Sequence, residues 1–438
     1  MRRTSKSLSV LLLLILLAIL SFVMYGNVQL AMENSGSDIE MVSDDKAETN
    51  TSPEENIDIK IAVCGDIVAH TGLNSEALQP DGSYDYRQMM EGAASVVESA
   101  DLALVTLETT FPKTTDYTGF PLFKSPSGLA KSLADVGFDL INTANNHSMD
   151  SYQSGLIRTL DVLDENGLDY VGTYRTQEER DEHCGVVIKE INGITIAFLS
   201  YTYGTNGLPV AGFEYAVNIF FKDYMSNQAD MSDIDYDLLR TDMKYARSLK
   251  TDLIIPLMHW GYEYNRTPNS YQEELADFLF AEGADIILGG HVHVPQPMEL
   301  RRVTDNEGNE KTGFIAYCLG NFISSQNDLF TNLTVALELS ISKNPNTGET
   351  SLKHVSYKPL YMVDLDDHGV PYADWRYRLW DLREAITEFD NGDDKGVIHH
   401  GMYNTMKQDL DRLHSVMDSE FDEINGGVDV EKWTRENG

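Results

Sequence analysis

The pentapeptide Gly289-Gly290-His291-Val292-His293 is the most informative stretch of this chain. It follows the short apolar run Ile286–Leu288, so we expect it to lie where a strand ends and a loop begins. In an extended segment, residues i and i+2 point to the same side, which would direct both histidine rings at one site. The two glycines allow neighbouring backbone to approach closely. The motif therefore predicts a metal site at the carboxyl edge of a sheet.

Five further polar clusters also follow apolar, strand-like runs. They are Gly65-Asp66, Leu107-Glu108, Asn145-Asn146-His147, His259-Trp260-Gly261 and Gly320-Asn321-Phe322. Each cluster taken alone has an ordinary structural explanation, because a strand-end aspartate usually forms a turn and a histidine after an apolar strand is usually a hydrogen-bonded core residue. All of these explanations would have to hold together for a shared site to be absent. Carboxylates and neutral imidazoles from several loops are what a two-metal hydrolytic centre requires.

The order of the predicted elements indicates the fold class. Strands are predicted at 57–64, 102–107, 138–143, 169–171, 186–191, 194–200, 253–258, 286–288, 296–302, 314–319, 333–341 and 352–360, and helices at 86–99, 127–136, 155–166, 236–249 and 271–282. The first part alternates strands with helices and the later part has strands only. This order predicts an α/β layered sandwich, with a central sheet or paired sheets flanked by helices.

The N-terminus predicts a membrane anchor. Arg2 and Arg3 precede an apolar run from Leu8 to Tyr25. At about 1.5 Å per residue, a helix over this run is roughly 27 Å long, close to the thickness of a bilayer core. A cleaved signal peptide is the alternative, but its apolar region is usually about 7–15 residues, and Gln29 stands where a cleavage site at Ala31 would need a small residue. Because the basic residues stay inside, we expect a single-pass cell-membrane protein whose C-terminal part is extracytoplasmic.

Four segments are predicted along the chain. Residues 1–32 form a cytoplasmic tip and transmembrane anchor, and residues 33–56 form an acidic, flexible linker without a core of its own. Residues 57–363 form the α/β domain. Residues 364–438 carry apolar side chains at helical spacing, which favours a helical extension packed on the domain over a helix that docks a partner.

Composition excludes some classes of function. The 438 residues are 42% hydrophobic, which is enough for a large core. The net charge of −37, from 70 acidic and 33 basic residues, argues against nucleic acid as a partner. Cys64, Cys184 and Cys318 are far apart and odd in number, so neither a disulfide framework nor a zinc–cysteine site is predicted.

Taken together, the motifs resemble the calcineurin-like metallophosphatases, and within them the CapA-type poly-γ-glutamate capsule synthesis proteins. The resemblance covers roughly residues 57–326 and is carried by Phe123-Lys124-Ser125-Pro126, Ala144-Asn145-Asn146-His147 with Asp150, His259-Trp260-Gly261, Gly290-His291-Val292-His293 and Leu319-Gly320-Asn321-Phe322. It implies that residues 57–363 have a metallophosphatase-like sandwich fold.

The resemblance also implies roles for individual residues. The metal ligands would be Asp66, Glu108, Asn146, His259, His291 and His293. Glu108 would take the bridging place that an aspartate holds in ordinary metallophosphatases. His147 matches the histidine that protonates a leaving group, Asp150 would orient it, and Lys124 is a candidate for binding an anionic substrate. The expected cofactor is a divalent metal ion (Mn, Fe, Zn or Mg), one or two per chain.

One position departs from the phosphatase pattern. Those enzymes carry Asp-x-His at the first strand end, whereas this chain has Asp66-Ile67-Val68, and a valine cannot bind metal. His70 lies nearby at a different spacing. We therefore expect the first metal to be weak, absent or differently ligated. CapA-type proteins in general lack that histidine, so the departure favours them over true phosphatases.

Three functions are open at this point. The first is an anchored extracytoplasmic protein for synthesis, export or anchoring of a capsular polymer such as poly-γ-glutamate, acting as a metal-dependent hydrolase or transferase on an anionic polymer or envelope substrate, alongside membrane synthase subunits. The second is a non-catalytic polymer-binding or scaffold component of such a synthase complex. The third is a general metal-dependent phosphoesterase, which Val68 disfavours. An acidic protein repels a polyanion, so contact would need bound cations or a local basic patch.

Overall fold

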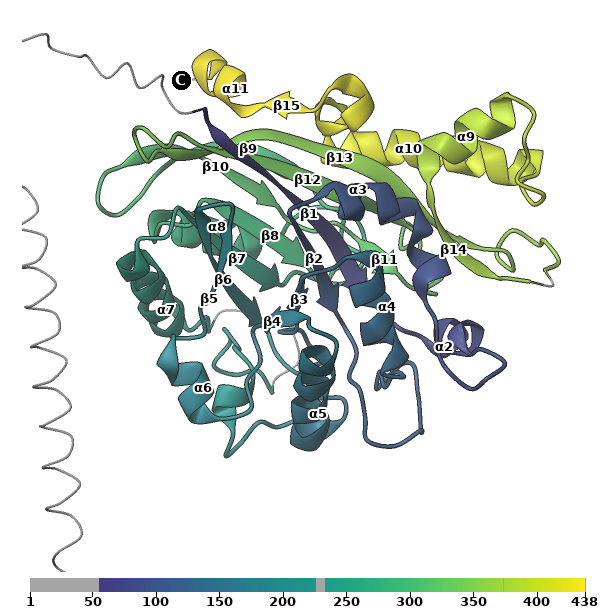
Figure 1. The fold of residues 1–438 in the computed structure, drawn as a ribbon, viewed down its shortest axis with the longest axis horizontal. Helices are drawn as coiled ribbons and strands as arrows, with labels where there is room; N and C mark the ends of the chain where they lie inside the picture. The colour runs from purple at the N-terminus through teal and green to yellow at the C-terminus, as the bar shows by residue number, and fades with distance from the viewer. Residues whose placement is uncertain (1–54, 226–232, 373, 438) are drawn as a thin grey trace, which may run out of the picture. The chain divides into compact units, whose positions relative to one another are not determined.

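Two β-sheets face each other at the centre of the computed structural model (Figure 1). The structure describes residues 55–225, 233–372 and 374–437, all within the unit Pro53–Gly438. The predicted anchor over 8–25 and nearly all of the predicted linker over 33–56 lie outside these ranges. Within them, no helix has the length and apolar character needed to cross a membrane.

The elements have the following bounds. The strands are β1 (Ile57–Ile67), β2 (Leu102–Leu107), β3 (Leu140–Asn142), β4 (Asp169–Val171), β5 (Val187–Ile191), β6 (Ile194–Thr202), β7 (Leu253–His259), β8 (Ile286–Gly290), β9 (Met298–Thr304), β10 (Glu310–Ala316), β11 (Asn321–Ile323), β12 (Leu333–Lys343), β13 (Thr350–Asp364), β14 (Tyr377–Asp381) and β15 (Val428–Asp429). The α-helices are α2 (Thr71–Ala77), α3 (Ala94–Ser99), α4 (Gly128–Val136), α5 (Tyr152–Glu165), α6 (Gln177–Glu182), α7 (Tyr236–Leu249), α8 (Ser270–Ala281), α9 (Leu382–Asp390), α10 (His400–Met417) and α11 (Val430–Glu436). The 3₁₀ helices are η1 (Arg87–Ala93), η2 (Glu214–Ala216), η3 (Ser419–Phe421) and η4 (Glu423–Asn425).

Parallel pairing brings several strand ends to one edge of the sandwich. In the first sheet, in the order β14-β13-β12-β1-β2-β3-β4, the strands from β1 to β4 run parallel. In the second sheet, in the order β5-β6-β7-β8-β10-β9, the strands β6, β7 and β8 run parallel. The β2 sequence LALVTL is buried at every position, as expected of a parallel strand covered on both faces. The loops after β1, β2, β3, β7 and β8 therefore share one edge, where α/β sheets carry their chemistry.

Three buried clusters define the layers. Between the sheets, Ile61 and Leu104 of the first sheet pack with Ile255 and Leu257 of the second. The outer face of the first sheet is covered by α3, α4 and α5, and that of the second by α7 and α8. The predicted α/β layered sandwich with flanking helices is confirmed.

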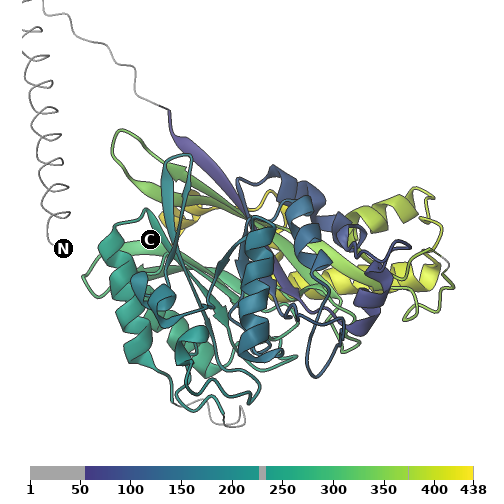
Figure 2. The same cartoon turned by 60° about the horizontal axis from the view of Figure 1, so that its bottom comes forward.

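The C-terminal segment adds both strands and helices. The strands β14 and β15 each pair with β13, and neither was predicted from the sequence. On α10, Met402 and Met406 pack in one cluster with Leu382 of α9, whereas Leu413 and Met417 reach the cluster between the sheets. Figures 1 and 2 show these yellow-green helices lying along β13.

The structure corrects the helix that was predicted over 86–99. The segment begins as the 3₁₀ helix η1 and becomes α-helical only in α3. Gly92 lies in η1 against β14, and a Cβ atom there would come within 2.6 Å of the Leu379 carbonyl oxygen. Glycine at this position therefore allows η1 to approach the backbone of β14, a tertiary contact that a local periodic pattern does not report.

Candidate metal centre

The edge where the parallel strands end gathers all six predicted ligands. They are Asp66 in β1, Glu108 directly after β2, Asn146 after β3, His259 at the end of β7, and His291 and His293 after β8. All six are at most 3% exposed. Side chains from five separate strand ends therefore lie together in the interior, and only the folded chain brings them together.

Two compact sets of ligand-type atoms share Glu108. One set comprises Glu108, His259 and His291, and the other comprises Asp66, Glu108 and His293. Within each set, one atom from each residue lies within 4.8 Å of the others. Asn146 Oδ1 lies beside the first set, because it accepts a hydrogen bond from His259 Nε2 at 2.7 Å. A carboxylate common to two sets is the arrangement that a bridged two-metal site needs.

The unpartnered atoms of this cluster test whether a cation fits. Six buried polar atoms have no hydrogen-bond partner in the described structure: Asp66 Oδ1, both Glu108 carboxylate oxygens, His259 Nδ1 and both His291 ring nitrogens. Buried polar groups are nearly always hydrogen-bonded, so this concentration of unpartnered atoms needs an explanation. Oxygen and imidazole nitrogen are ligands for divalent ions such as Zn, Mn and Fe. The residues present therefore fit a divalent metal ion.

The electrostatics of the cluster favour metal-binding protonation states. Burial alone would raise the pKa of Glu108, but His293 and His259 outweigh it and lower the pKa to about 2. Burial, reinforced by the neighbouring His259, lowers the pKa of His291 well below its ordinary range. An ionised carboxylate and a neutral imidazole are the forms that coordinate metal.

The backbone of the histidine motif differs from the extended geometry that its spacing suggested. β8 ends at Gly290, and His291 and His293 have φ values of 93° and 64°, in the left-handed region. Asp66 Oδ2 accepts a hydrogen bond from the His291 backbone N–H at 2.7 Å, and a Cβ atom on Gly290 would lie 2.6 Å from Asp66 Oδ1. The two rings still converge, with centroids 6.0 Å apart. Left-handed backbone at non-glycine residues is costly and concentrates at functional sites.

His147 and Asp150 form a buried pair beside the ligand sets. His147 Nδ1–H donates to Asp150 Oδ2 at 2.7 Å, and the same oxygen accepts the Phe123 backbone N–H at 2.5 Å. The other ring nitrogen, Nε2, lies 4.0 Å from Glu108 Oε1. Burial would lower the pKa of His147, but the Asp150 and Glu108 carboxylates outweigh it and raise the pKa. The pair can therefore hold a proton at Nε2, facing the centre.

Two asparagines at the site were not among the predicted functional residues. Asn206 Nδ2 lies 3.3 Å from His147 Nε2, and its Oδ1 accepts a hydrogen bond from Asn146 Nδ2 at 3.2 Å. Asn321 Oδ1 accepts the His293 Nδ1–H at 2.9 Å and so fixes the orientation of that ring. Asn206 gave no signal because Asn206-Gly207 is an ordinary turn sequence. Asn321 lay in a cluster that was singled out, but its partner could not be known.

Lys124, Val68 and His70 lie close to the centre without joining it. Lys124 follows Phe123 in the sequence, and the Phe123 ring packs edge-on against that of His147, with centroids 4.6 Å apart. The Lys124 ammonium group has no hydrogen bond or ion pair with the described residues. Val68 is 1% exposed and provides no ligand atom. The ring of His70 also packs edge-on against Phe123, at 4.9 Å, and burial lowers the pKa of His70 to about 4. Neither compact ligand set within the described residues includes His70.

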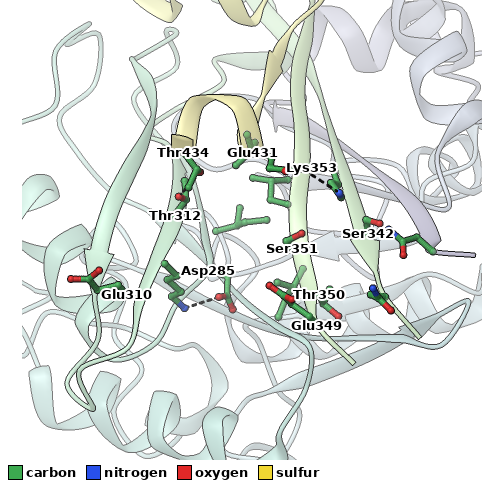
Figure 3. A pocket seen from close by; sticks show the side chains of 17 residues that line it. Asp285, Glu310, Thr312, Ser342, Glu349, Thr350, Ser351, Lys353, Glu431 and Thr434 are labelled. Carbon is green, nitrogen blue, oxygen red and sulfur yellow. Dashed lines mark hydrogen bonds and ion pairs between the residues drawn. The ribbon is translucent and has the colours of Figure 1, made fainter. Parts of the chain in front are cut away.

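A separate cavity of about 540 Å³ lies away from this centre (Figure 3). Its lining includes Leu253 and Ile286, the first residues of β7 and β8, together with Thr312, Ser351 and Thr434. Because His259 and Gly290 stand at the other ends of the same two strands, the cavity and the metal centre lie at opposite ends of the second sheet. None of the predicted site residues lines it.

None of the three cysteines belongs to either compact ligand set, and Cys64 and Cys318 are buried. All three are free thiols in the described structure.

Comparison with solved structures gives distant likenesses. A novel phosphatase from Mycoplasma pneumoniae is 15% identical with a TM-score of 0.40, covering 70% of this chain and 94% of that one. A hypothetical protein from Thermus thermophilus is 13% identical with a TM-score of 0.36, covering 69% and 98%. At these values neither likeness carries an argument about function.

Comparison with curated sequences and family models is more specific. The PGA biosynthesis protein CapA of Bacillus subtilis is 30% identical over 215 residues, or 49% of this chain and 50% of that protein. The capsule biosynthesis protein CapA of Bacillus anthracis is 31% identical over 199 residues, or 45% and 42%. This chain thus matches about half the length of each relative. The model of the bacterial capsule synthesis protein PGA_cap matches residues 60–326. This range contains every strand end of the metal centre, and the chain belongs to the PGA_cap family of bacterial capsule synthesis proteins.

Proposed function

We propose that this protein is a metal-dependent hydrolase or transferase that acts in the synthesis, export or anchoring of a capsular polymer such as poly-γ-glutamate. The observation that carries the proposal is the pairing of His147 with Asp150, 4.0 Å from the carboxylate shared by both ligand sets. A protein that only binds polymer needs no buried acid oriented by a carboxylate. A group-transfer enzyme does, because its leaving group must be protonated.

Two groups of residues would have separate roles, one binding the metal ions and the other transferring a proton. Glu108, His259, His291 and Asn146 would hold one divalent ion, and Asp66, Glu108 and His293 would hold a second. A divalent ion there would supply a Lewis acid that polarises the scissile bond.

Proton transfer would belong to His147. Asp150 accepts the Nδ1–H and so leaves Nε2 as the atom that exchanges a proton with substrate. The raised pKa of His147 favours the protonated form that a general acid needs near neutral pH. Asn206 Nδ2 lies 3.3 Å from Nε2, in the place that a leaving-group atom would take, so substrate would have to displace this amide.

The names of the relatives and the N-terminal sequence support a proposal for the polymer and for the cellular location. The relatives carry the names PGA biosynthesis protein and capsule biosynthesis protein, but this chain matches only about half of each. We propose the same polymer class here, with the apolar run Leu8–Tyr25 as a single-pass membrane anchor, an extracytoplasmic catalytic part and membrane synthase subunits as partners.

A non-catalytic scaffold is the second candidate, and one observation favours it. Val68 leaves the Asp66, Glu108 and His293 set with three ligand residues, against four around His259. A site that has lost one ligand can retain a binding role after its chemistry has gone.

Complementation separates the two candidates. A capsule-forming host that lacks its own relative receives the full chain, the His147→Ala variant, or the control His183→Ala, whose imidazole is an exposed surface group with 62% of its area accessible. We expect His183→Ala to restore capsule and His147→Ala to restore none, with equal protein levels in the membrane fraction. Full capsule production with His147→Ala would overturn the catalytic proposal and would favour the non-catalytic scaffold function.

A further inference from the structure

We propose that Arg266 and Arg412, which both lie over the ring of Phe330, form a subsite that binds a carboxylate of an anionic polymer beside the metal centre. The guanidinium carbon of Arg266 is 4.3 Å from the ring centroid, and that of Arg412 is 5.5 Å away. The three residues come from different parts of the chain: the loop after β7, the loop after β11, and α10. The proposal rests on the proposed function, because it locates the polymer that the metal centre would act on.

Packing joins this subsite to the segment that carries the two histidines. Phe330 packs against a buried cluster of Val292, Val294 and Cys318. Val292 stands between His291 and His293 in the sequence. The Arg266 loop is fastened to the same segment, because the Tyr264 backbone N–H donates to the Val292 carbonyl oxygen at 2.8 Å. A polymer held at the arginines would therefore lie against the wall of the metal centre.

The charges at this place are exceptional for the chain. Among the described arginines, Arg266 and Arg302 alone have no carboxylate within 4.0 Å. Arg266 Nη2 instead donates to the backbone oxygen of Arg412, at 3.0 Å. The Arg412 guanidinium has one acidic partner, Asp409, at 2.7 Å. Two guanidinium groups against one carboxylate leave an excess positive charge in a protein whose net charge is −37.

The chemistry of the pair indicates a planar anion. A guanidinium that lies over an aromatic ring can still donate from its N–H groups, and a carboxylate can accept two such bonds in parallel. One nitrogen of each arginine is already engaged, Arg266 Nη2 with the Arg412 oxygen and Arg412 Nη1 with Asp409, which leaves the other N–H groups of both side chains for an anion. Two like charges held over one ring repel each other, and a bound anion would relieve the repulsion. Phe330 itself has a φ of 75°, in the left-handed region that an aromatic residue rarely adopts. The local positive charge also supplies the basic patch that an acidic protein needs to meet a polyanion.

Direct binding tests the subsite without reference to catalysis. The full chain in detergent, with EDTA present so that no cation bridges the partners, is titrated with fluorescently labelled poly-γ-glutamate and followed by anisotropy. We expect Arg266→Gln and Arg412→Gln each to raise the Kd about tenfold, since each removes a charge-assisted hydrogen bond to the ligand. The matched control is Arg301→Gln, because Arg301 also lies over an aromatic ring, Tyr317, but is neutralised by Glu299 and Asp277. The control should leave the Kd unchanged.

Three results would overturn the subsite: no binding by the wild-type chain, equal weakening by Arg301→Gln, or wild-type affinity in both arginine variants. Arg266→Lys guards against a folding artefact, because it keeps the charge and loses the planar fork; we expect a Kd between those of wild type and Arg266→Gln. A parallel titration with polyphosphate identifies the anion, and tighter binding of polyphosphate would overturn the assignment to carboxylate. Metal content measured on the same variants separates this proposal from the proposed function, because the arginine variants should keep their metal.

Discussion

Glu108 Oε1 lies 3.4 Å from His259 Nε2, yet neither oxygen of this fully buried carboxylate has a hydrogen-bond partner in the described structure. Burying a charge without compensation is expensive, and removing its partners costs several kcal/mol. The neighbouring imidazoles compensate in part, and they hold the pKa of Glu108 at about 2. A divalent cation between the two ligand sets would complete the compensation.

Replacement of the shared carboxylate should therefore empty both ligand sets. Glu108→Gln keeps the size of the side chain and removes its charge, so we expect metal content to fall to background in the purified full chain. Elemental analysis by mass spectrometry measures this directly. The control is Glu273→Gln, since Glu273 is exposed on α8. Retention of one metal by Glu108→Gln would show that the two sets do not depend on a common carboxylate.

The two ligand sets should differ in affinity. Asn146 supplements the set around His259 and His291, whereas Val68 gives nothing to the set of Asp66, Glu108 and His293. Titration of the metal-free protein with Mn²⁺ by calorimetry should show one tight site and one at least about tenfold weaker, a difference of about 1.4 kcal/mol.

Variants assign these two sites. His291→Ala should abolish the tight site, and Asp66→Asn the weak one, because each residue belongs to one set only. Two sites of equal affinity, or loss of both in Asp66→Asn, would contradict the assignment.

The His147 imidazole should titrate above the ordinary histidine pKa of about 6.5 in the metal-free protein. Burial opposes the charged form, but the Asp150 and Glu108 carboxylates stabilise it. In Asp150→Asn the charge is lost while the burial remains, so the pKa should fall below that of wild type. The proton that the imidazole could give to a leaving group would then be lost at lower pH. NMR of protein labelled at the histidine ring carbons follows the titration, with His147→Ala assigning the signal.

The exposed carboxylate Asp116 provides the control, because Asp116→Asn should leave the His147 titration unchanged. A His147 pKa that is unaffected by Asp150→Asn would mean that the buried pair does not hold the proton at Nε2.

Local sequence was sufficient for much of the fold. The strand predicted over 102–107 and the helix predicted over 236–249 have these same bounds in β2 and α7, because the first is a short, nearly continuous apolar run and the second has apolar residues at helical spacing. The strand β14 was not predicted. Its five residues, YRLWD, alternate buried and partly exposed side chains too briefly to stand out, and they are specified by pairing with β13.

The residues of the candidate site also fall into those that local sequence could predict and those that depend on distant contacts. Asp66, Glu108 and His259 could be singled out because an acid or imidazole at the end of an apolar strand is visible in one segment. The contacts of Asn206 with Asn146 and His147 join loops about 60 residues apart, so no local pattern could reveal them. The left-handed backbone of His291 is likewise not visible in the local sequence, and its N–H donates to Asp66 Oδ2, 225 residues away.

Asn145 should matter for stability and Asn206 should not, although both lie at the centre. Asn145 is fully buried; its Nδ2 donates to the Leu107 carbonyl oxygen at 2.8 Å and its Oδ1 accepts the His147 backbone N–H at 3.0 Å. Asn145→Ala leaves both backbone groups without a partner in the interior, so we expect a loss of about 2–3 kcal/mol in the free energy of unfolding. Asn206 is itself exposed, so solvent can take the place of its amide, and Asn206→Ala should change this free energy by less than about 0.5 kcal/mol. Urea denaturation of the metal-free chain, followed by tryptophan fluorescence, measures both. Because Asn145 joins the strand end that carries Glu108 to the loop that carries His147, an equal and small effect of the two variants would mean that the two loops are held together by their backbones alone.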